Sequence, residues 1–256
     1  MTEFTRTELM VVAAARELRD GEVVFVGVGI PTLATILAKR THAPNLCFLT
    51  ESGVVGGRPS RLPLSIADPC LVTGAQAICS TVELFALYLQ RGHVDVGFLG
   101  GAQVDKYGNL NSTVIGPYAQ PQVRFPGSGG ACEIASLAKR TLIIMPQGRR
   151  RFVEKVDFIT SPGFLSGGNA RAEVGLPGGG PSAVVSDLGL FRFDPVDREM
   201  YLASIHPGVT VEQVRAQTGW DLRVAEDLPV TPPPTEEELR IVRELDPTAH
   251  FLSREG

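Results

Sequence analysis

The sequence predicts an α/β fold built on a largely parallel, open β-sheet flanked by helices. Short apolar runs rich in Val, Leu, Ile and Phe alternate along the chain with segments of helical periodicity. Many of the 28 glycines follow these runs directly, as expected where strands end in tight turns. No stretch has the composition of a domain linker and no repeat of useful length is present, so we expect one domain spanning residues 1–256.

The first half of the chain alternates helices and strands. Apolar residues at helical spacing predict a helix from Thr7 to Arg19, and Gly21 is a typical stop after it. Further helices are expected at residues 31–40 and 80–92. Buried strands that lead into turns are expected at residues 22–31, 46–50, 94–105 and 140–146.

The second half has a different pattern. Residues 182–194 and 200–205 are expected to form strands or hairpins. The Pro-rich segment from Pro229 leads into a short terminal helix, for which Thr235 and Glu238 have the spacing of a capping box.

Composition excludes several classes of protein. The net charge of -4 provides no basic surface for nucleic acid, and no apolar run approaches the roughly 20 residues that span a bilayer. The first residues lack a basic segment followed by a cleavage site, so we expect a cytoplasmic protein. The four cysteines are scattered without a C-x-x-C pair, which favours packed, reduced thiols over a metal site.

Glu51 stands out because it follows the apolar run that ends at Leu49 and precedes Gly53, Gly56 and Gly57. It either caps a turn or joins a surface ion pair, or it is presented to a reactant as a nucleophile. Ser52 is a competing nucleophile. However, the four histidines lie in no recognisable base motif, so a serine triad lacks support.

Three glycine-containing segments allow other interpretations. "GVGIP", from Gly27, lacks the third glycine of the dinucleotide fingerprint, although Glu51 could supply the acid that an NAD-binding fold needs. "RFPGSGGACEIA", residues 124–135, exposes backbone N–H groups suited to an oxyanion, or forms an ordinary loop. "GGAQVDKYGNLNST", residues 100–113, holds polar side chains such as Gln103 that either bind a ligand or bond to their own turns.

Taken in order, "TESGVVG", "GGAQVDKYGNLNST", "RFPGSGGA", "RRFVEKVDFITSPGF" and "LGLFRFD" resemble the class I, glutaconate-type coenzyme A transferases. The resemblance runs from about Thr7 to Phe251 and is to the β subunit of that family. It implies the CoA-transferase fold, with Glu51 of "ESG" as the nucleophile. It also implies that "GSGGA" faces the reacting carbonyl, with Gly129 and Gly130 as the candidate oxyanion donors.

The same resemblance implies transfer of CoA between carboxylic acids through a glutamyl-CoA thioester on Glu51. Coenzyme A then enters as the acyl-CoA co-substrate, without a bound cofactor or metal. Family members pair with an α subunit, often as α2β2, so a hetero-oligomer is expected. We add Ser52, Gly53, Arg58 and Gln103 as candidate pocket residues. Arg58 and Arg61 either pair with a substrate carboxylate or form structural salt bridges.

Other functions remain open at this stage. Relatives on this fold include hydrolases and decarboxylases, in which the glutamate is typically replaced, whereas this chain retains Glu51. A nucleotide-binding Rossmann protein and a non-catalytic partner subunit are further alternatives. The sequence identifies neither the acyl group nor the direction of transfer.

Overall fold

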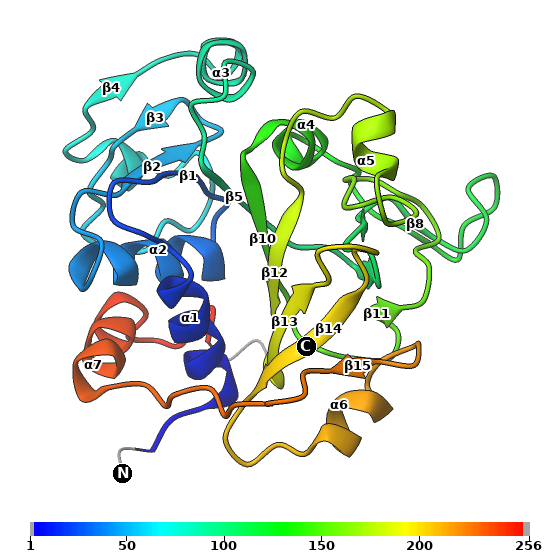
Figure 1. Cartoon of the computed structure of the whole chain (residues 1–256). Helices are drawn as coiled ribbons and strands as arrows, with labels where there is room; N and C mark the ends of the chain where they lie inside the picture. The colour runs from blue at the N-terminus through cyan, green and yellow to red at the C-terminus, as the bar shows by residue number, and fades with distance from the viewer. Residues whose placement is uncertain (1–2, 253–256) are drawn as a thin grey trace. The chain divides into compact units, whose positions relative to one another are not determined.

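The computed structural model describes residues 3–252 and divides into two compact units (Figure 1). Unit 1 holds the chain up to Phe98 and again from Pro232, and unit 2 holds residues Leu99–Thr231. The prediction of one domain over residues 1–256 stays a prediction, and its outermost residues lie outside the described part.

Unit 1 contains five strands and six helical segments within its described residues. The strands are β1 (Val23–Phe25), β2 (Cys47–Thr50), β3 (Val54–Val55), β4 (Ala77–Ile78) and β5 (Val96–Leu99), whose last residue begins unit 2. The helical segments are α1 (Arg6–Arg16), α2 (Ile30–Arg40), the 3₁₀-helix η1 (Pro69–Val72), α3 (Thr81–Glu83), the π-helix η2 (Leu84–Leu89) and α7 (Glu236–Leu245).

Parallel pairing forms the centre of the sheet in unit 1. β1 pairs in parallel with β2 on one side and with β5 on the other, whereas β3 and β4 continue the sheet as antiparallel strands. Helices lie on both faces, because Phe48 faces residues of α2 while its neighbours Cys47 and Leu49 face η2. The predicted α/β fold with a largely parallel sheet flanked by helices is confirmed.

Unit 2 contains ten strands and three helices. The strands are β6 (Gln103–Asp105), β7 (Leu110–Asn111), β8 (Val114–Ile115), β9 (Val123–Arg124), β10 (Arg140–Ile144), β11 (Phe152–Val153), β12 (Pro181–Val185), β13 (Gly189–Phe193), β14 (Met200–Ile205) and β15 (Arg223–Val224). The helices are α4 (Ala131–Leu137), α5 (Ala170–Glu173) and α6 (Val211–Ala216).

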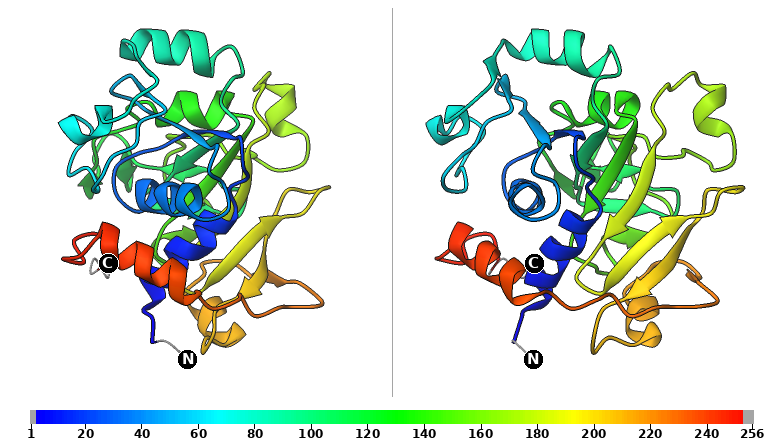
Figure 2. Two further views of the ribbon diagram at one scale, coloured as in Figure 1. Left: turned by 90° about the vertical axis from the view of Figure 1, so that its left-hand side faces the viewer. Right: turned by 60° about the vertical axis from the view of Figure 1, so that its left-hand side comes forward.

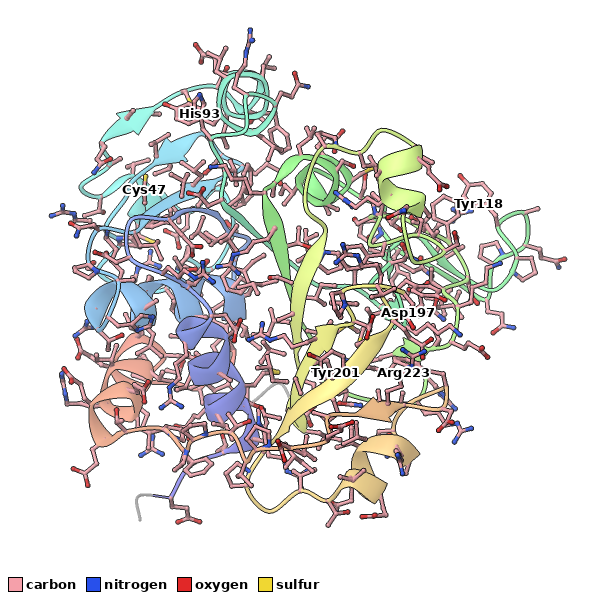
Figure 3. All side chains as sticks on the ribbon, viewed as in Figure 1. Cys47, His93, Tyr118, Asp197, Tyr201 and Arg223 are labelled. Carbon is pink, nitrogen blue, oxygen red and sulfur yellow. The ribbon has the colours of Figure 1, made fainter. Side chains whose placement is uncertain are left out.

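The hairpin prediction for the second half is correct. β12, β13 and β14 pair antiparallel, while β10 and β15 run parallel to β12 and β14 at the two sides of this meander. Arg223 of β15 donates a hydrogen bond of 2.6 Å to the carboxylate of Asp197, and both residues are labelled in Figure 3. The smaller groups β11-β6-β7 and β8-β9 complete the strands of this unit.

Most predicted elements of unit 1 are confirmed, with two differences. The helix expected at residues 80–92 forms as α3 followed by η2, because one turn widens to π-helical bonding. The helix expected to reach Arg19 ends at the cap residue Glu17. The terminal helix α7 begins with the predicted capping box, in which Thr235 and Glu238 bond reciprocally.

The first and last segments of unit 1 are held together by two ion pairs. Arg16 of α1 donates to Glu238 of α7 at 2.7 and 2.9 Å, and Arg243 of α7 donates to Glu8 of α1 at 2.7 and 3.2 Å. α7 also packs on α2, and Figure 2 shows these helices gathered at one end of the unit.

These ion pairs should make stability fall in acid. Burial, the largest single influence, raises the pKa of Glu8 and Glu238. The hydrogen bonds and charges of Arg243 and Arg16, together with the hydrogen bonds of the capping residues Thr5 and Thr235, outweigh burial and hold each pKa below its ordinary value of 4.5. Because the folded pKa is depressed, this stabilisation is complete above about pH 4.5 and disappears as pH falls through the folded pKa.

Thermal unfolding of the full chain between pH 7 and pH 3 measures this effect. We expect Glu238→Gln to lower the midpoint at pH 7 and to flatten its fall below pH 4.5. Glu237→Gln is the matched control, because this exposed neighbour forms no ion pair within residues 3–252. Curves for the wild type and Glu238→Gln that stay parallel across this range would contradict the prediction.

Candidate active site

Glu51 lies in the turn that joins β2 to β3. Gly53 N–H donates to the Thr50 carbonyl at 2.8 Å and closes the turn, with Glu51 and Ser52 as its two central residues. The Thr81 hydroxyl donates to the Glu51 carbonyl at 3.0 Å. Both neighbouring contacts act on the backbone, so they hold the position of residue 51 while leaving its side chain unengaged.

Glu51 is half-buried. Within residues 3–252 its carboxylate accepts no hydrogen bond and forms no ion pair. The turn-cap and surface ion-pair interpretations are therefore not observed in this part of the chain. Because β1 and β2 are parallel, their carboxyl ends place Glu51 at the same sheet edge as the Gly27–Gly29 loop.

Gly53 is required by close packing inside unit 1. Its φ is +91°, and a Cβ built on it would lie 1.8 Å from the carbonyl oxygen of Cys79. Cys79 N–H in turn donates to the Gly53 carbonyl at 2.9 Å. Gly57 meets a similar constraint, since its Cβ would lie 2.4 Å from the Leu71 carbonyl oxygen. The segment 71–79 thus explains glycine at both positions.

Ser52 is exposed, and its hydroxyl lies 2.9 Å from the Thr50 hydroxyl. No histidine in the described part of the chain is hydrogen-bonded to Ser52. His206, for comparison, is buried against the Thr231 hydroxyl and the Ser186 carbonyl in unit 2. This geometry gives a serine triad no support.

Arg58 and Arg61 follow β3 and have different environments. Arg61 forms a bidentate ion pair with Asp68, at 2.8 and 2.9 Å, which is the structural salt bridge considered from the sequence. Arg58 is exposed, and β3 carries it back toward the amino end of β2, since Gly56 N–H donates to the Phe48 carbonyl. Arg58 therefore lies at the opposite end of this hairpin from Glu51, and its assignment to an acyl pocket stays a prediction.

Gln103 is buried in a polar network of unit 2. Its side-chain carbonyl accepts hydrogen bonds from the Asn111 side chain at 2.7 Å and from Asp157 N–H at 3.1 Å. Its side-chain amide donates to the Asp157 carboxylate at 3.3 Å. Asn109 likewise bonds Asp105, Gly163 and Leu165. Bonding within their own turns therefore accounts for only part of these contacts, because both side chains also bond residues of the distant segment 157–165. A role of Gln103 toward substrate stays a prediction.

The GSGGA segment of unit 2 opens helix α4. Gly130 is the buried N-cap residue, and Gly129 is exposed with φ of +50°. Ser112 holds the preceding Gly127 through two hydrogen bonds, at 2.9 and 3.0 Å. The N–H groups of Gly129 and Gly130 donate no hydrogen bond within residues 3–252. They are suited by chemistry to an oxyanion, as the sequence predicts.

Two residues that support the candidate site belong to no functional motif of the sequence. Thr81 fixes the Glu51 carbonyl, and only the capping box of Ser80 and Glu83, visible as "STVE", indicates an ordered turn there. Arg171 is buried and donates to the carbonyls of Ala135, Ser136, Pro162, Gly163 and Gly178, anchoring the carboxyl end of α4. A single arginine in the short helix α5 gives no sequence signal for such a role.

The described residues contain no group of three or more His, Cys, Asp or Glu side chains placed to hold a metal ion. All four cysteines are free thiols and half-buried. Between residues 3 and 252, every helix is too short or too polar to cross a membrane.

Comparison with curated proteins finds extended similarity. The chain is 49% identical over 246 residues to the B subunit of 3-oxoadipate CoA-transferase from Pseudomonas knackmussii, covering 96% of this chain and 95% of that protein. It is 38% identical to the B subunit of glutaconate CoA-transferase from Acidaminococcus fermentans, covering 98% and 96%. The cholesterol ring-cleaving hydrolase IpdB subunit of Rhodococcus jostii is more distant, at 28%, covering 96% and 94%.

Comparison with solved structures also places a glutaconate CoA-transferase above a decarboxylase in similarity. Glutaconate coenzyme A-transferase of Acidaminococcus fermentans superposes with a TM-score of 0.92 at 38% identity, covering 98% of both chains. The decarboxylase AibA/AibB gives a TM-score of 0.82 at 29% identity, covering 97% of this chain and 98% of that one. The sequence profile described as "Coenzyme A transferase" matches residues 7–217. The chain therefore belongs to the coenzyme A transferase family.

Proposed function

We propose that this chain is the β subunit of a CoA-transferase that moves CoA between carboxylic acids through a glutamyl-CoA thioester on Glu51. The observation that carries the proposal is the environment of this residue. Its backbone is fixed by the Gly53 turn and by Thr81, while its carboxylate has no partner within the described residues. A nucleophile needs this combination of fixed position and available oxygen.

The chemistry consists of two attacks and their reversal. A Glu51 carboxylate oxygen attacks the thioester carbonyl carbon, the C–S bond breaks, and CoA thiolate leaves an acyl-glutamyl anhydride. The thiolate then attacks the glutamyl carbonyl carbon, the anhydride C–O bond breaks, and the first carboxylic acid departs as its carboxylate. A second carboxylate takes CoA by the reverse steps. A carboxylate and backbone N–H donors supply this chemistry, so no resident cofactor or metal is needed.

Each tetrahedral intermediate carries an oxyanion. We assign its stabilisation to the N–H groups of Gly129 and Gly130, because neither donates within residues 3–252 and both precede the body of α4. One such donor typically contributes about 3–4 kcal/mol to transition-state stabilisation. Ser52, Gly53 and Gln103 remain candidates for the pocket with less support, given the internal contacts of Gly53 and Gln103. Arg58 has the least support, because it lies at the opposite end of the β2–β3 hairpin from Glu51.

The partner is an α subunit, in an α2β2 assembly, and the substrates are an acyl-CoA and a carboxylic acid. The names of the relatives support this, because they are the B subunits of 3-oxoadipate and glutaconate CoA-transferases. Both names specify dicarboxylic acids, so an acid of that class is the first substrate to test. The four free thiols agree with a reducing, cytoplasmic location.

Covalent capture tests the proposal. The chain is co-purified with its α partner, incubated with succinyl-CoA, glutaconyl-CoA and acetyl-CoA in turn, and treated with hydroxylamine. Peptide mass spectrometry should find a hydroxamate on Glu51 that Glu51→Gln lacks. Steady release of CoA without any Glu51 adduct would overturn the proposal and favour the hydrolase or decarboxylase chemistry named for the more distant relatives.

A further inference from the structure

A cavity lies within unit 1, between the carboxyl half of α2 and the β2–β3 hairpin. Its volume is about 330 Å³, at the lower end of the range for small-molecule sites. Its apolar lining consists of Ile36, Pro44, Phe48 and Pro59. Three cations also line it: Lys39, Arg40 and Arg58. No Asp or Glu belongs to the described residues that line this cavity.

The strand register separates this cavity from Glu51. Phe48 lies at the second position of β2, and Gly57 and Arg58 follow β3 after it has run back alongside β2. Lys39 approaches from α2 and donates to the carbonyls of Leu46 and Pro44, just before β2 begins. The cavity is therefore at the amino end of β2, whereas Glu51 follows its carboxyl end. It also opens on the face of β2 opposite Cys47, which is labelled in Figure 3.

The three cations differ in their partners. Arg40 is neutralised by Glu244, which accepts two hydrogen bonds of 3.0 Å from it. Lys39 bonds only neutral carbonyls among the described residues, and burial together with the charge of Arg58 lowers its pKa. Asp20 is close enough to oppose this shift weakly, but its carboxylate is occupied by Asn45. Two like charges thus face one cavity without a bound carboxylate.

Arg58 supplies the second charge from a fixed stem. A Cβ added at Gly74 would lie 3.3 Å from the Arg58 Cβ, so the backbone at Gly74 packs closely against the base of the Arg58 side chain. The guanidinium itself forms no hydrogen bond or ion pair within residues 3–252. A guanidinium offers five N–H donors in a planar fork that matches carboxylate and phosphate oxygens.

We propose that this cavity binds a small organic anion, with a carboxylate or phosphate head between Lys39 and Arg58 and a short apolar body against Ile36 and Phe48. The head would separate the two like charges and satisfy the Arg58 donors, and the body would pack on the apolar lining. This inference is independent of the proposed function, because it involves neither Glu51 nor the transfer of CoA.

Isothermal titration calorimetry at constant ionic strength tests it on the purified complex carrying Glu51→Gln, in which transfer cannot proceed. The probes are hexanoate, which has both head and body, inorganic phosphate, which has only a head, and 1-hexanol, which has only a body. We expect hexanoate to bind most tightly. Arg58→Met should weaken hexanoate binding at least about tenfold, as for the loss of a charge-assisted hydrogen bond.

Arg91→Met is the matched control, since it removes the same charge from an exposed arginine of unit 1 that does not line the cavity. This variant should leave the affinity for hexanoate unchanged. Adding saturating coenzyme A to the complex should also leave that affinity unchanged. Equal weakening by both variants would mean general screening of charge and would overturn the proposal. Displacement of hexanoate by coenzyme A would also overturn it, by placing the anion in the transfer site.

Discussion

Replacing Glu51 by Gln should lower turnover of the co-purified complex at least about a thousandfold, because loss of a covalent nucleophile removes the step itself. The amide retains the shape of the side chain but is a far weaker nucleophile. Since the carboxylate has no partner within residues 3–252, the free energy of unfolding should change little. The measurement is the initial rate of CoA transfer, alongside thermal unfolding of each complex.

Two further variants sharpen this result. Glu226→Gln removes an exposed carboxylate from unit 2 and should leave the rate unchanged. Glu51→Asp keeps the carboxylate but draws it back by one methylene group, so it should retain a measurable rate above that of Glu51→Gln. Full activity of Glu51→Gln would show that this chain only completes a site whose nucleophile lies elsewhere.

Substituting Gly53 by Ala should destabilise the chain by about 3–5 kcal/mol, which is large for the addition of one methyl group. Two costs combine at this position. A φ of +91° is strained for any residue with a Cβ, and that Cβ would lie 1.8 Å from a backbone carbonyl oxygen of Cys79. Backbone cannot move aside as a flexible side chain can, so the turn that carries Glu51 must shift.

Gly21→Ala separates these two costs. Gly21 has a similar φ of +80°, but nothing lies within 4 Å of a Cβ built there. It should therefore cost only about 1–2 kcal/mol, from backbone strain alone. Urea unfolding of the full chain gives both values. Equal costs for the two variants would mean that the contact with Cys79 is not a rigid constraint.

The fold was largely predictable because its signals are local. Apolar runs such as residues 46–50 and 140–146 have the length and composition of buried strands, and both form strands. The capping box at Thr235 is equally local and begins α7 as expected. The π-helical turn of η2 was not predictable, because its apolar residues fit an α-helix as well.

The candidate site was predictable in identity but not in its supporting contacts. Glu51 could be singled out by its position between a strand and a glycine cluster. At Gly53 and Gly57, however, glycine is required by packing, because backbone of segment 71–79 fills the space that a Cβ would need. Contacts of this kind join residues about 14 to 26 positions apart, and a single sequence carries no record of them.

The divided composition of unit 1 has a consequence for the order in which the chain can mature. A ribosome releases α1, α2 and the strands around Glu51 early, then all of unit 2, and only afterwards α7. Until Glu238 and Arg243 emerge, their partners Arg16 and Glu8 remain exposed to water, and α2 lacks the helix that covers it. Unit 2 is one continuous segment, so all of its residues are available as soon as that segment has been synthesised. The unit that carries Glu51 is thus begun first and finished last.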